Sequence, residues 1–284
     1  MRGAGGEPID FARTLRSHGC ADLPPATVAA DATSYRTILR VRGKPRAVTV
    51  RANRVELIAV YEGTLGVAER NELSAMLRRM FRLDENFAPF YADISGEAQL
   101  GWAARGAGRM LASPTAFEDV VKTICTTNCA WSGTVRMMSA LVEHLGGGAF
   151  PSPQTMAAAP ESFYRDVARA GYRGPYLQQL AREVATGAID LETLRPQYAL
   201  PDAEVESRLL ALPGVGPYAC AHIMMLLGRY HRLILDSWTR PKYLQVSGRK
   251  RAADATIERA FRRYGAFAGL AFWLTITRDW VAEK

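Results

Sequence analysis

The chain has 284 residues, of which 48% are hydrophobic, and it carries a formal net charge of +8. This length suits one large domain or two modest ones, and the apolar content excludes a chain that is disordered over most of its length. No apolar run is long enough to cross a membrane and the N-terminus lacks an apolar signal segment, so we expect an intracellular protein. The positive charge favours a polyanionic partner such as nucleic acid, although a solvated basic surface would explain it equally well. The four cysteines form no CxxC pair, which favours buried free thiols over a zinc or iron–sulfur site.

Residues 34 to 62 are predicted to form antiparallel strands. Apolar and polar residues alternate in "SYRTILRVRG" and again in "RVELIAVYEG", as expected for half-buried strands. "RGKPR" and "RAN" supply turn residues between them. Seven basic residues lie between Arg36 and Arg54 with no acid among them, so this region faces either phosphate or solvent.

Helical spacing begins at Val67 and continues to the end of the chain. A long helical part starts near Ser113, either with that serine as N-cap or with a capping box from Thr115 to Glu118. Several shorter helices with proline starts and glycine ends follow, and the apolar segment 267–277 predicts a buried helix. The sequence thus predicts a mostly α protein with an N-terminal antiparallel β-sheet. We expect an α+β domain over residues 1–112 and a helical core over residues 113–284.

The stretch "ALPGVGPYACAHIMML", residues 211–226, places two glycines and two prolines between helical patterns. Asp202 can cap a helix that runs through Leu210, and Pro217 suits the first position of the next helix. A helix that opens directly after such a turn presents free N–H groups to an anion, here from Gly214, Gly216 and Tyr218. A plain helix–turn–helix corner is the alternative, because a lone G-x-G is weak evidence.

The complete segment is a more specific signal than a lone G-x-G, since "LPGVG" stands between two predicted helices and small residues follow at Ala219 and Ala221. It resembles the helix-hairpin-helix of DNA-binding and repair proteins. Asp236 lies twenty residues beyond Gly216, about where helix-hairpin-helix DNA glycosylases carry their catalytic aspartate. A lone aspartate at a helix start is otherwise an N-cap. The resemblance implies a helix-hairpin-helix DNA glycosylase fold with Asp236 as the catalytic residue.

The resemblance extends over roughly residues 113 to 280 and implies further sites. It matches Asn128 to an asparagine that fills the space of a flipped base, and Tyr172 and Arg173 to residues that wedge the duplex. With Gly214 and Gly216, these are the expected DNA-binding residues. The backbone carbonyls of Leu210, Leu212 and Val215 are implied to bind a monovalent cation, K⁺ or Na⁺. No cysteine follows Cys220, so no iron–sulfur cluster is expected, and no other cofactor is required.

Several departures place the chain between 8-oxoguanine DNA glycosylases and the 3-methyladenine DNA glycosylase II type. Tyr218 stands where bifunctional members have a Schiff-base lysine and where monofunctional alkyl-purine glycosylases have an aromatic residue. Phe272 replaces the base-reading glutamine of the 8-oxoguanine enzymes, and Gly133 replaces an expected arginine. The candidate base pocket comprises Tyr218, Trp131, Phe272 and His222, with weaker candidates in Trp238 and Trp273.

We therefore predict a monofunctional DNA glycosylase of base excision repair that hydrolyses the N-glycosidic bond of a damaged, alkylated purine. The partner is double-stranded DNA with a damaged base, and we expect a monomer without membrane association. We expect the protein in the cytoplasm, associated with the nucleoid, if it is bacterial, and in the nucleus if it is eukaryotic. One alternative is an 8-oxoguanine-type glycosylase/lyase that uses Lys122 or Lys242 as its amine. The other is a non-catalytic protein that binds damaged DNA.

Overall fold

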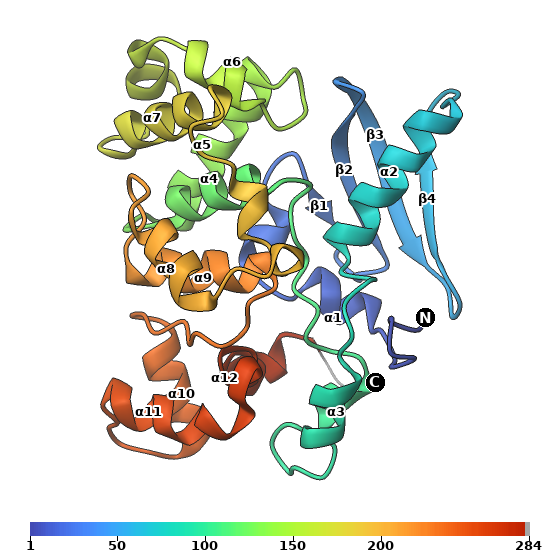
Figure 1. Ribbon diagram of the computed structural model, residues 1–284, viewed down its shortest axis with the longest axis vertical. Coiled ribbons are helices and arrows are strands. Elements are labelled where there is room, and N and C mark those ends of the chain that lie inside the picture. Colours follow the sequence, from blue (N-terminus) through green and yellow to red (C-terminus); the bar gives the residue numbers. More distant parts are fainter. Residues whose placement is uncertain (282–284) are drawn as a thin grey trace.

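The computed structural model describes residues 1–281, and in it a four-stranded antiparallel sheet lies beside a larger assembly of helices (Figure 1). The strands are β1 (Thr27–Val28), β2 (Ser34–Val41), β3 (Lys44–Ala52) and β4 (Leu57–Tyr61). Each strand pairs with its neighbour in sequence, in the order β1-β2-β3-β4. The predicted fold class, mostly α with an N-terminal antiparallel sheet, is confirmed.

The alternating pattern of β2 sets which face of the sheet is buried. Tyr35, Thr37, Leu39 and Val41 are buried, whereas the residues between them are partly or fully exposed. The turn after β2 is tighter than expected, because Val41 pairs directly with Lys44 and leaves a two-residue turn. Both turn residues have positive φ, as the twist of a two-residue hairpin requires. Lys44, Pro45 and Arg46, which we expected in the turn, therefore begin β3.

Helices follow the sheet from Val67 onward, as predicted, and one short helix before the sheet was not predicted. They are α1 (Phe11–Leu15), α2 (Val67–Met80), α3 (Ala88–Ile94), α4 (Ala116–Thr126), α5 (Trp131–Ala140), α6 (Pro153–Ala158), α7 (Arg173–Ala185), α8 (Asp202–Leu210), α9 (Pro217–Leu227), α10 (Thr239–Ser247), α11 (Asp254–Phe261) and α12 (Ala268–Thr277). Of the two possible starts of α4, the structure uses Thr115, whose side chain accepts a hydrogen bond from the Glu118 amide. Every residue of α12 is buried, as its uniformly apolar sequence predicted.

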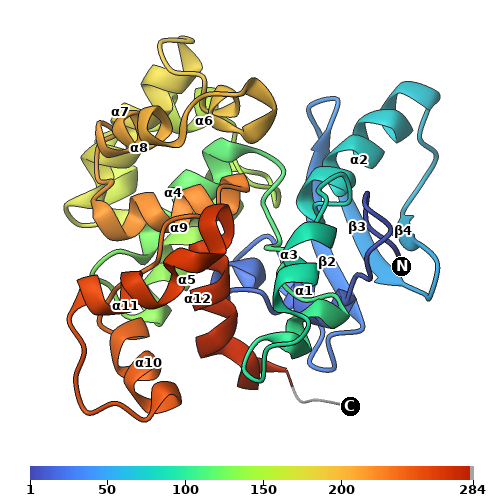
Figure 2. The same cartoon turned by 60° about the horizontal axis from the view of Figure 1, so that its bottom comes forward.

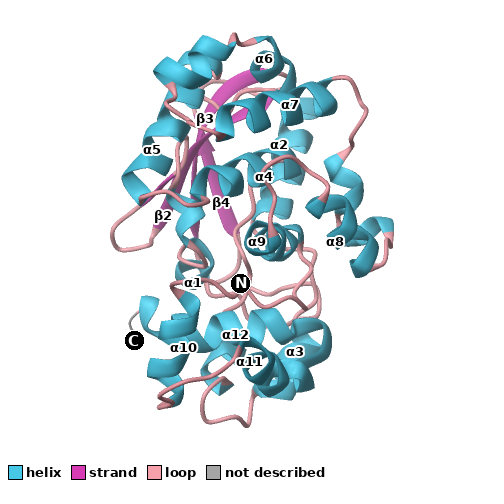
Figure 3. Cartoon of the chain, turned by 90° about the vertical axis from the view of Figure 1, so that its left-hand side faces the viewer, coloured by secondary structure: helices cyan, strands magenta, loops and turns pink. Residues whose placement is uncertain are grey.

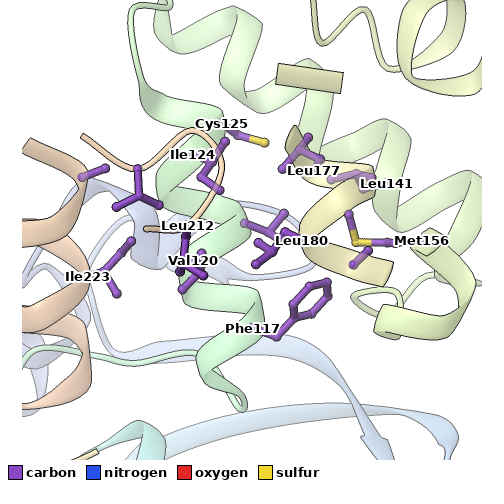
Figure 4. Close-up of a cluster of buried hydrophobic side chains, with 14 of the residues drawn as sticks. Phe117, Val120, Ile124, Cys125, Leu141, Met156, Leu177, Leu180, Leu212 and Ile223 are labelled. Atoms are coloured by element: carbon purple, nitrogen blue, oxygen red, sulfur yellow. The ribbon is translucent and has the colours of Figure 1, made fainter. Parts of the chain in front are cut away.

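Three groups of buried apolar side chains form the interior. The sheet core joins β2 and β3 to α2, and the hairpin core joins α4 to α9 (Figure 4). The C-terminal core joins α10, α11 and α12 to Phe87, Phe90 and other residues up to Met110. Residues 87–110 thus pack with the C-terminal helices and not with the sheet, although they precede position 112. The division into domains 1–112 and 113–284 stays a prediction.

Helix α9 lies between the hairpin core and the C-terminal core. It runs between α4 and α8 on one side and the α10–α12 group on the other (Figures 2 and 3). Ile223 and Met224 belong to the hairpin core, while Ala221 and Met225 belong to the C-terminal core. Helix α9 is therefore packed on both sides. Among residues 1–281, no helix combines the length and the apolar character needed to cross a membrane.

Candidate active-site cleft

Helices α8 and α9 are joined by the hairpin at residues 211–216. Leu212 donates its amide to Leu209 and Val215 donates to Leu212, so these two N–H groups are used within the turn. Within residues 1–281, the amides of Gly214 and Gly216 make no hydrogen bond. Pro217 occupies the first position of α9, as predicted, and the first turn of this helix leaves its amides unpartnered. The hairpin therefore offers several N–H groups to an anion.

The two glycines of the hairpin are needed for different reasons. Gly214 has a φ of 79°, and a Cβ there would lie 2.9 Å from the Tyr176 ring, so both conformation and packing require glycine. Gly216 has an extended backbone, and a Cβ there would meet nothing within 4 Å. The fold itself does not require a glycine at position 216. Its lack of a side chain instead leaves the open face of the hairpin clear for another molecule.

Asp236 lies in the loop before α10 and is half-buried. Its Oδ1 accepts hydrogen bonds from the amides of Trp238 at 2.9 Å and Thr239 at 2.6 Å. Its own amide donates to the Thr239 hydroxyl at 2.8 Å. These bonds fix the side chain at the start of α10, so the capping role considered from the sequence is present. They occupy one carboxylate oxygen, and Oδ2 accepts no hydrogen bond from the described residues.

Asp236 and the hairpin face the same cleft, which has a volume of about 660 Å³. Its walls come from the loop after α4, the start of α7, the hairpin with the first turn of α9, and the loop before α10. The lining residues are Thr126, Thr127, Asn128, Cys129, Tyr172, Gly214, Gly216, Tyr218, Ala219, Leu235, Asp236 and Ser237. Six residues predicted from separate motifs thus meet in one cleft: Asn128, Tyr172, Gly214, Gly216, Tyr218 and Asp236.

Tyr218 forms the wall of the cleft at the start of α9. It is partly buried and packs against both the hairpin core and the C-terminal core. Burial raises the pKa of its phenol, and the nearby carboxylate of Asp236 raises it further. The ring is therefore neutral at physiological pH, and it contributes an aromatic surface and a hydroxyl group to the cleft but no amine.

Asn128 and Tyr172 also line the cleft and are exposed. The Asn128 amide group donates to the Tyr172 hydroxyl at 3.4 Å. Asn128 has a φ of 44°, a conformation that asparagine tolerates better than most residues. Asn128 lines the cleft, as the resemblance implied.

Arg173, which was predicted to contact DNA, does not line the cleft. It is only 6% exposed, and its guanidinium donates to the carbonyl oxygens of Thr127 and Ala170. It also lies 4.5 Å from the centre of the Tyr172 ring. A buried guanidinium needs such partners, so its donors are used inside the protein. Arg173 instead supports the backbone before Asn128 and the ring of Tyr172.

Three other predicted pocket residues lie outside the cleft. Phe272 is 0% exposed and packs against Tyr243 and Phe261, because α12 is enclosed on all sides and leaves no open face. Trp131 is 50% exposed, but it borders a second cavity beside the N-terminal segment. His222 shares a helix face with Tyr218, yet it is buried behind the Tyr218 ring at a centroid distance of 6.1 Å.

Neither candidate amine lies in the cleft. Lys122 is buried, and its Nζ lies 2.8 Å from Glu118 and 3.2 Å from the Ser113 hydroxyl. Burial lowers the pKa of Lys122, but Glu118, Tyr35 and Asp119 together raise it above its ordinary value. The Nζ of Lys242 pairs with Asp279 at 2.7 Å. Among the described residues that line the cleft there is no lysine.

Sequence reasoning missed one aromatic residue near the cleft, Tyr176. Tyr176 packs over Gly214 and lies 6.1 Å from the Tyr172 ring, so it supports both the hairpin and Tyr172. The weaker candidates Trp238 and Trp273 do not line the cleft. The backbone amide of Trp238 donates to Asp236, and its ring packs at a tilt against Trp273 and Trp280. Helical spacing from Tyr172 could have indicated Tyr176, because residues four apart share a face.

The hairpin carbonyls are compatible with the predicted cation site. Within residues 1–281, the carbonyl of Leu212 accepts one hydrogen bond from Val215, and those of Leu210 and Val215 accept none. A carbonyl oxygen has two lone pairs, so each of the three keeps one for a cation. Their identity as K⁺ or Na⁺ ligands stays a prediction.

No protein-family model matches the sequence, and no curated protein is significantly similar to it. Solved structures match over nearly the whole chain. The 8-oxoguanine glycosylase/lyase of Clostridium acetobutylicum is 19% identical, with a TM-score of 0.72 over 96% of this chain and 94% of that one. The 3-methyladenine DNA glycosylase of Archaeoglobus fulgidus is 17% identical, with a TM-score of 0.74 over 97% and 98%.

The chain has the fold of the helix-hairpin-helix DNA glycosylases. Both types between which the sequence was placed share this fold at similar TM-scores. The Clostridium acetobutylicum enzyme is also known in complex with double-stranded DNA containing cytosine opposite 8-oxoguanine. Because the glycosylase fold serves both types, the reaction of this chain must be argued from the residues in its cleft.

Proposed function

We propose that this protein is a monofunctional DNA glycosylase that removes a damaged purine, an alkylated one above all, by hydrolysing its N-glycosidic bond. The observation that carries the proposal is the composition of the cleft. A carboxylate with one free oxygen, Asp236, shares it with the aromatic ring of Tyr218 and with no lysine.

The hairpin would bind the duplex through its backbone. The free amides of Gly214, Gly216 and the first turn of α9 would donate to phosphate oxygens, which requires no particular base sequence. Asn128 and Tyr172, which line the same cleft, would fill the space left by the extruded nucleotide. Extrusion costs a few kcal/mol, and less for a damaged base that stacks or pairs poorly.

Asp236 would stabilise the positive charge that develops on the sugar as the base leaves. Its Oδ1 is held by two backbone amides, so the free Oδ2 is fixed in advance and needs no reorganisation. The same oxygen can orient the attacking water or accept its proton. Water is the nucleophile in this scheme because a Schiff base needs a primary amine, and Tyr218 has none. The products are a free base and an abasic site.

The aromatic surface favours an electron-poor purine. An alkylated purine carries positive charge and is attracted to the face of a tyrosine or tryptophan ring. Tyr218 lines the cleft and supplies this aromatic surface.

Duplex oligonucleotides with single defined lesions test the proposal. We expect release of a free alkylated purine and a strand that stays intact until alkali is added. Borohydride should trap no covalent protein–DNA adduct. A trapped adduct with the wild-type protein would instead support the glycosylase/lyase alternative, and Lys122→Arg and Lys242→Arg would then identify the amine. Tight binding without release of any base would indicate a non-catalytic damage-binding protein.

A further inference from the structure

A buried cluster of two histidines and one cysteine lies behind Tyr218, outside the cleft. His18 and Cys20 come from the N-terminal segment, Cys20 within a short 3₁₀ helix at Gly19–Asp22, and His222 comes from α9. All three side chains are buried. One nitrogen or sulfur atom of each lies within 4.8 Å of the corresponding atoms of the other two. The Cys20 Sγ is 3.9 Å from His222 Nε2.

The two imidazoles have unused polar atoms. Nδ1 of His18 and Nδ1 of His222 are buried and have no hydrogen-bond partner among the described residues. Nε2 of His18 lies 2.6 Å from the carbonyl oxygen of Leu111, so Nε2 carries the proton and Nδ1 keeps its lone pair. A histidine that binds a metal typically donates its second N–H to a carbonyl in this way.

Charged groups of both signs surround the cluster. Lys122 and Arg82 act on the His18 side and Asp236 on the His222 side. Lys122 and Asp119 both act on Cys20, and Lys122 is itself paired with Glu118. The rings of His18 and His222 meet edge to face at a centroid distance of 5.9 Å, so both imidazoles are held at the cluster by packing.

We propose that His18, Cys20 and His222 bind one Zn²⁺ ion. One thiolate and two imidazoles are typical zinc ligands, whereas Ca²⁺ and Mg²⁺ prefer oxygen. On binding, the Cys20 S–H bond breaks, a Zn–S bond forms and the proton passes to solvent. Three protein ligands leave one position of the tetrahedron for water. His18 also lines the cavity of about 510 Å³ beside Trp131, which gives the ion a route from solvent.

The ion would connect parts of the chain that are far apart in sequence. Cys20 and His222 are separated by 202 positions. Zinc would tie the N-terminal segment to α9, one turn after Tyr218 and close to the hairpin. Its main effect would be to stabilise the folded chain, because a site formed only in the folded state couples binding to folding.

The test uses the full-length protein without DNA, so its result does not depend on the proposed glycosylase activity. Protein reconstituted with Zn²⁺ and passed through a desalting column should retain one zinc per chain by elemental analysis. With Co²⁺ it should show visible bands of tetrahedral cobalt and a near-ultraviolet thiolate-to-cobalt charge-transfer band. Cys20→Ser should lose that band, and His222→Ala should lose the bound metal. Cys220→Ser is the matched control, because Cys220 is a buried free thiol on the same helix and should leave binding unchanged.

Thermal unfolding gives an independent measurement should a variant fold poorly. The wild type and Cys220→Ser should both unfold at higher temperature with Zn²⁺ than with a chelator, whereas His222→Gln should show no difference. Folded wild-type protein that retains no zinc and gives no cobalt charge-transfer band would overturn the proposal. So would full zinc retention by both Cys20→Ser and His222→Ala. Either result would leave the proposed glycosylase reaction unaffected.

Discussion

The cleft and the interior beneath the N-terminal segment use charged groups in opposite ways. In the cleft, Asp236 keeps one oxygen free. In the buried ion-pair seam, formed by Glu7, Arg82, Glu85 and Arg109, each residue has a partner of opposite charge. Glu7 also accepts hydrogen bonds from the amides of Phe87 and Gly5. An unpaired buried charge is costly, so the seam is organised for stability, whereas the cleft leaves donors and acceptors open for a ligand.

Replacing Asp236 by asparagine should have the largest effect on the reaction and almost none on the fold. Asparagine retains Oδ1 for the amides of Trp238 and Thr239, so α10 keeps its cap. The rate of base release under single-turnover conditions should fall by roughly 10²–10⁴ while DNA affinity persists. Asp254→Asn is the control, since that aspartate starts α11 and pairs with Arg240 at the surface. Near-normal excision by Asp236→Asn would remove this residue from the mechanism.

Replacing Glu7 by alanine should have the reverse effect, with a large loss of stability and no direct effect on chemistry. It leaves Arg109, which is fully buried, without its carboxylate partner. Breaking such a pair costs about 3–5 kcal/mol of unfolding free energy, measurable by urea denaturation. Asp166→Ala, which removes an exposed pair with Arg165, should change nothing measurable. Equal stabilities of the Glu7 and Asp166 variants would contradict the division between seam and cleft.

The seam should also respond to pH. Burial alone would raise the pKa of Glu7, but hydrogen bonds from backbone amides together with Arg109 hold it below its ordinary value of 4.5. A carboxyl group whose pKa is lower in the folded state stabilises the protein above pH 4.5, and this contribution is lost as the pH falls through the folded-state value. The wild type should therefore lose more stability between neutral and acidic pH than Glu7→Gln does. Parallel stability profiles for the two proteins would show that Glu7 is not the group responsible.

Tyr218 should contribute to binding of the damaged base. Tyr218→Ala should weaken binding to a lesion duplex by about 1–3 kcal/mol, the range for one base stacked on an aromatic ring, whereas Tyr218→Trp should be tolerated. Tyr198→Ala is a suitable control, because that tyrosine is exposed and does not line the cleft. Binding can be measured by fluorescence anisotropy, with undamaged duplex as reference. An equal loss of affinity for damaged and undamaged DNA would argue against stacking of Tyr218 on the damaged base.

The smallest expected effects come from replacing the two glycines of the hairpin, and the two replacements should affect different properties. Gly216→Ala should leave the unfolding free energy within about 0.5 kcal/mol of the wild type, because its Cβ meets nothing in the protein. It should still weaken DNA binding, since the methyl group would stand where phosphate approaches. Gly214→Ala should instead destabilise the fold, because φ is positive and Tyr176 is in the way. Unchanged DNA binding by Gly216→Ala would place the phosphate contact elsewhere.

Features that depend on neighbouring residues were predictable from the sequence. Thr115 and Glu118 form a cap three residues apart, and Pro217 opens α9 directly after the hairpin. The alternating residues of β2 lie as expected on the buried face of the sheet. Such features follow from backbone geometry and short-range hydrogen bonds, which the local sequence largely specifies.

The side chains that reach the cleft were less predictable. Asn128, Tyr172, Tyr218 and Asp236 meet there, as the resemblance implied. Arg173 is adjacent to Tyr172, yet its guanidinium turns inward to the Thr127 carbonyl. No pattern in the sequence distinguishes an arginine that binds phosphate from one that binds a carbonyl, because both are long cations on a helix.

The sequence by itself determined the order of the elements, the α8–hairpin–α9 unit and the distance from that unit to Asp236. Tertiary structure alone decided that Arg173 turns inward, that α3 packs with the C-terminal helices, and that His18 and Cys20 meet His222. The physical reason is the range of the interactions. Turns and caps are set within a few residues, whereas burial depends on which distant segments exclude water from a side chain, and this is known only once the whole chain has packed.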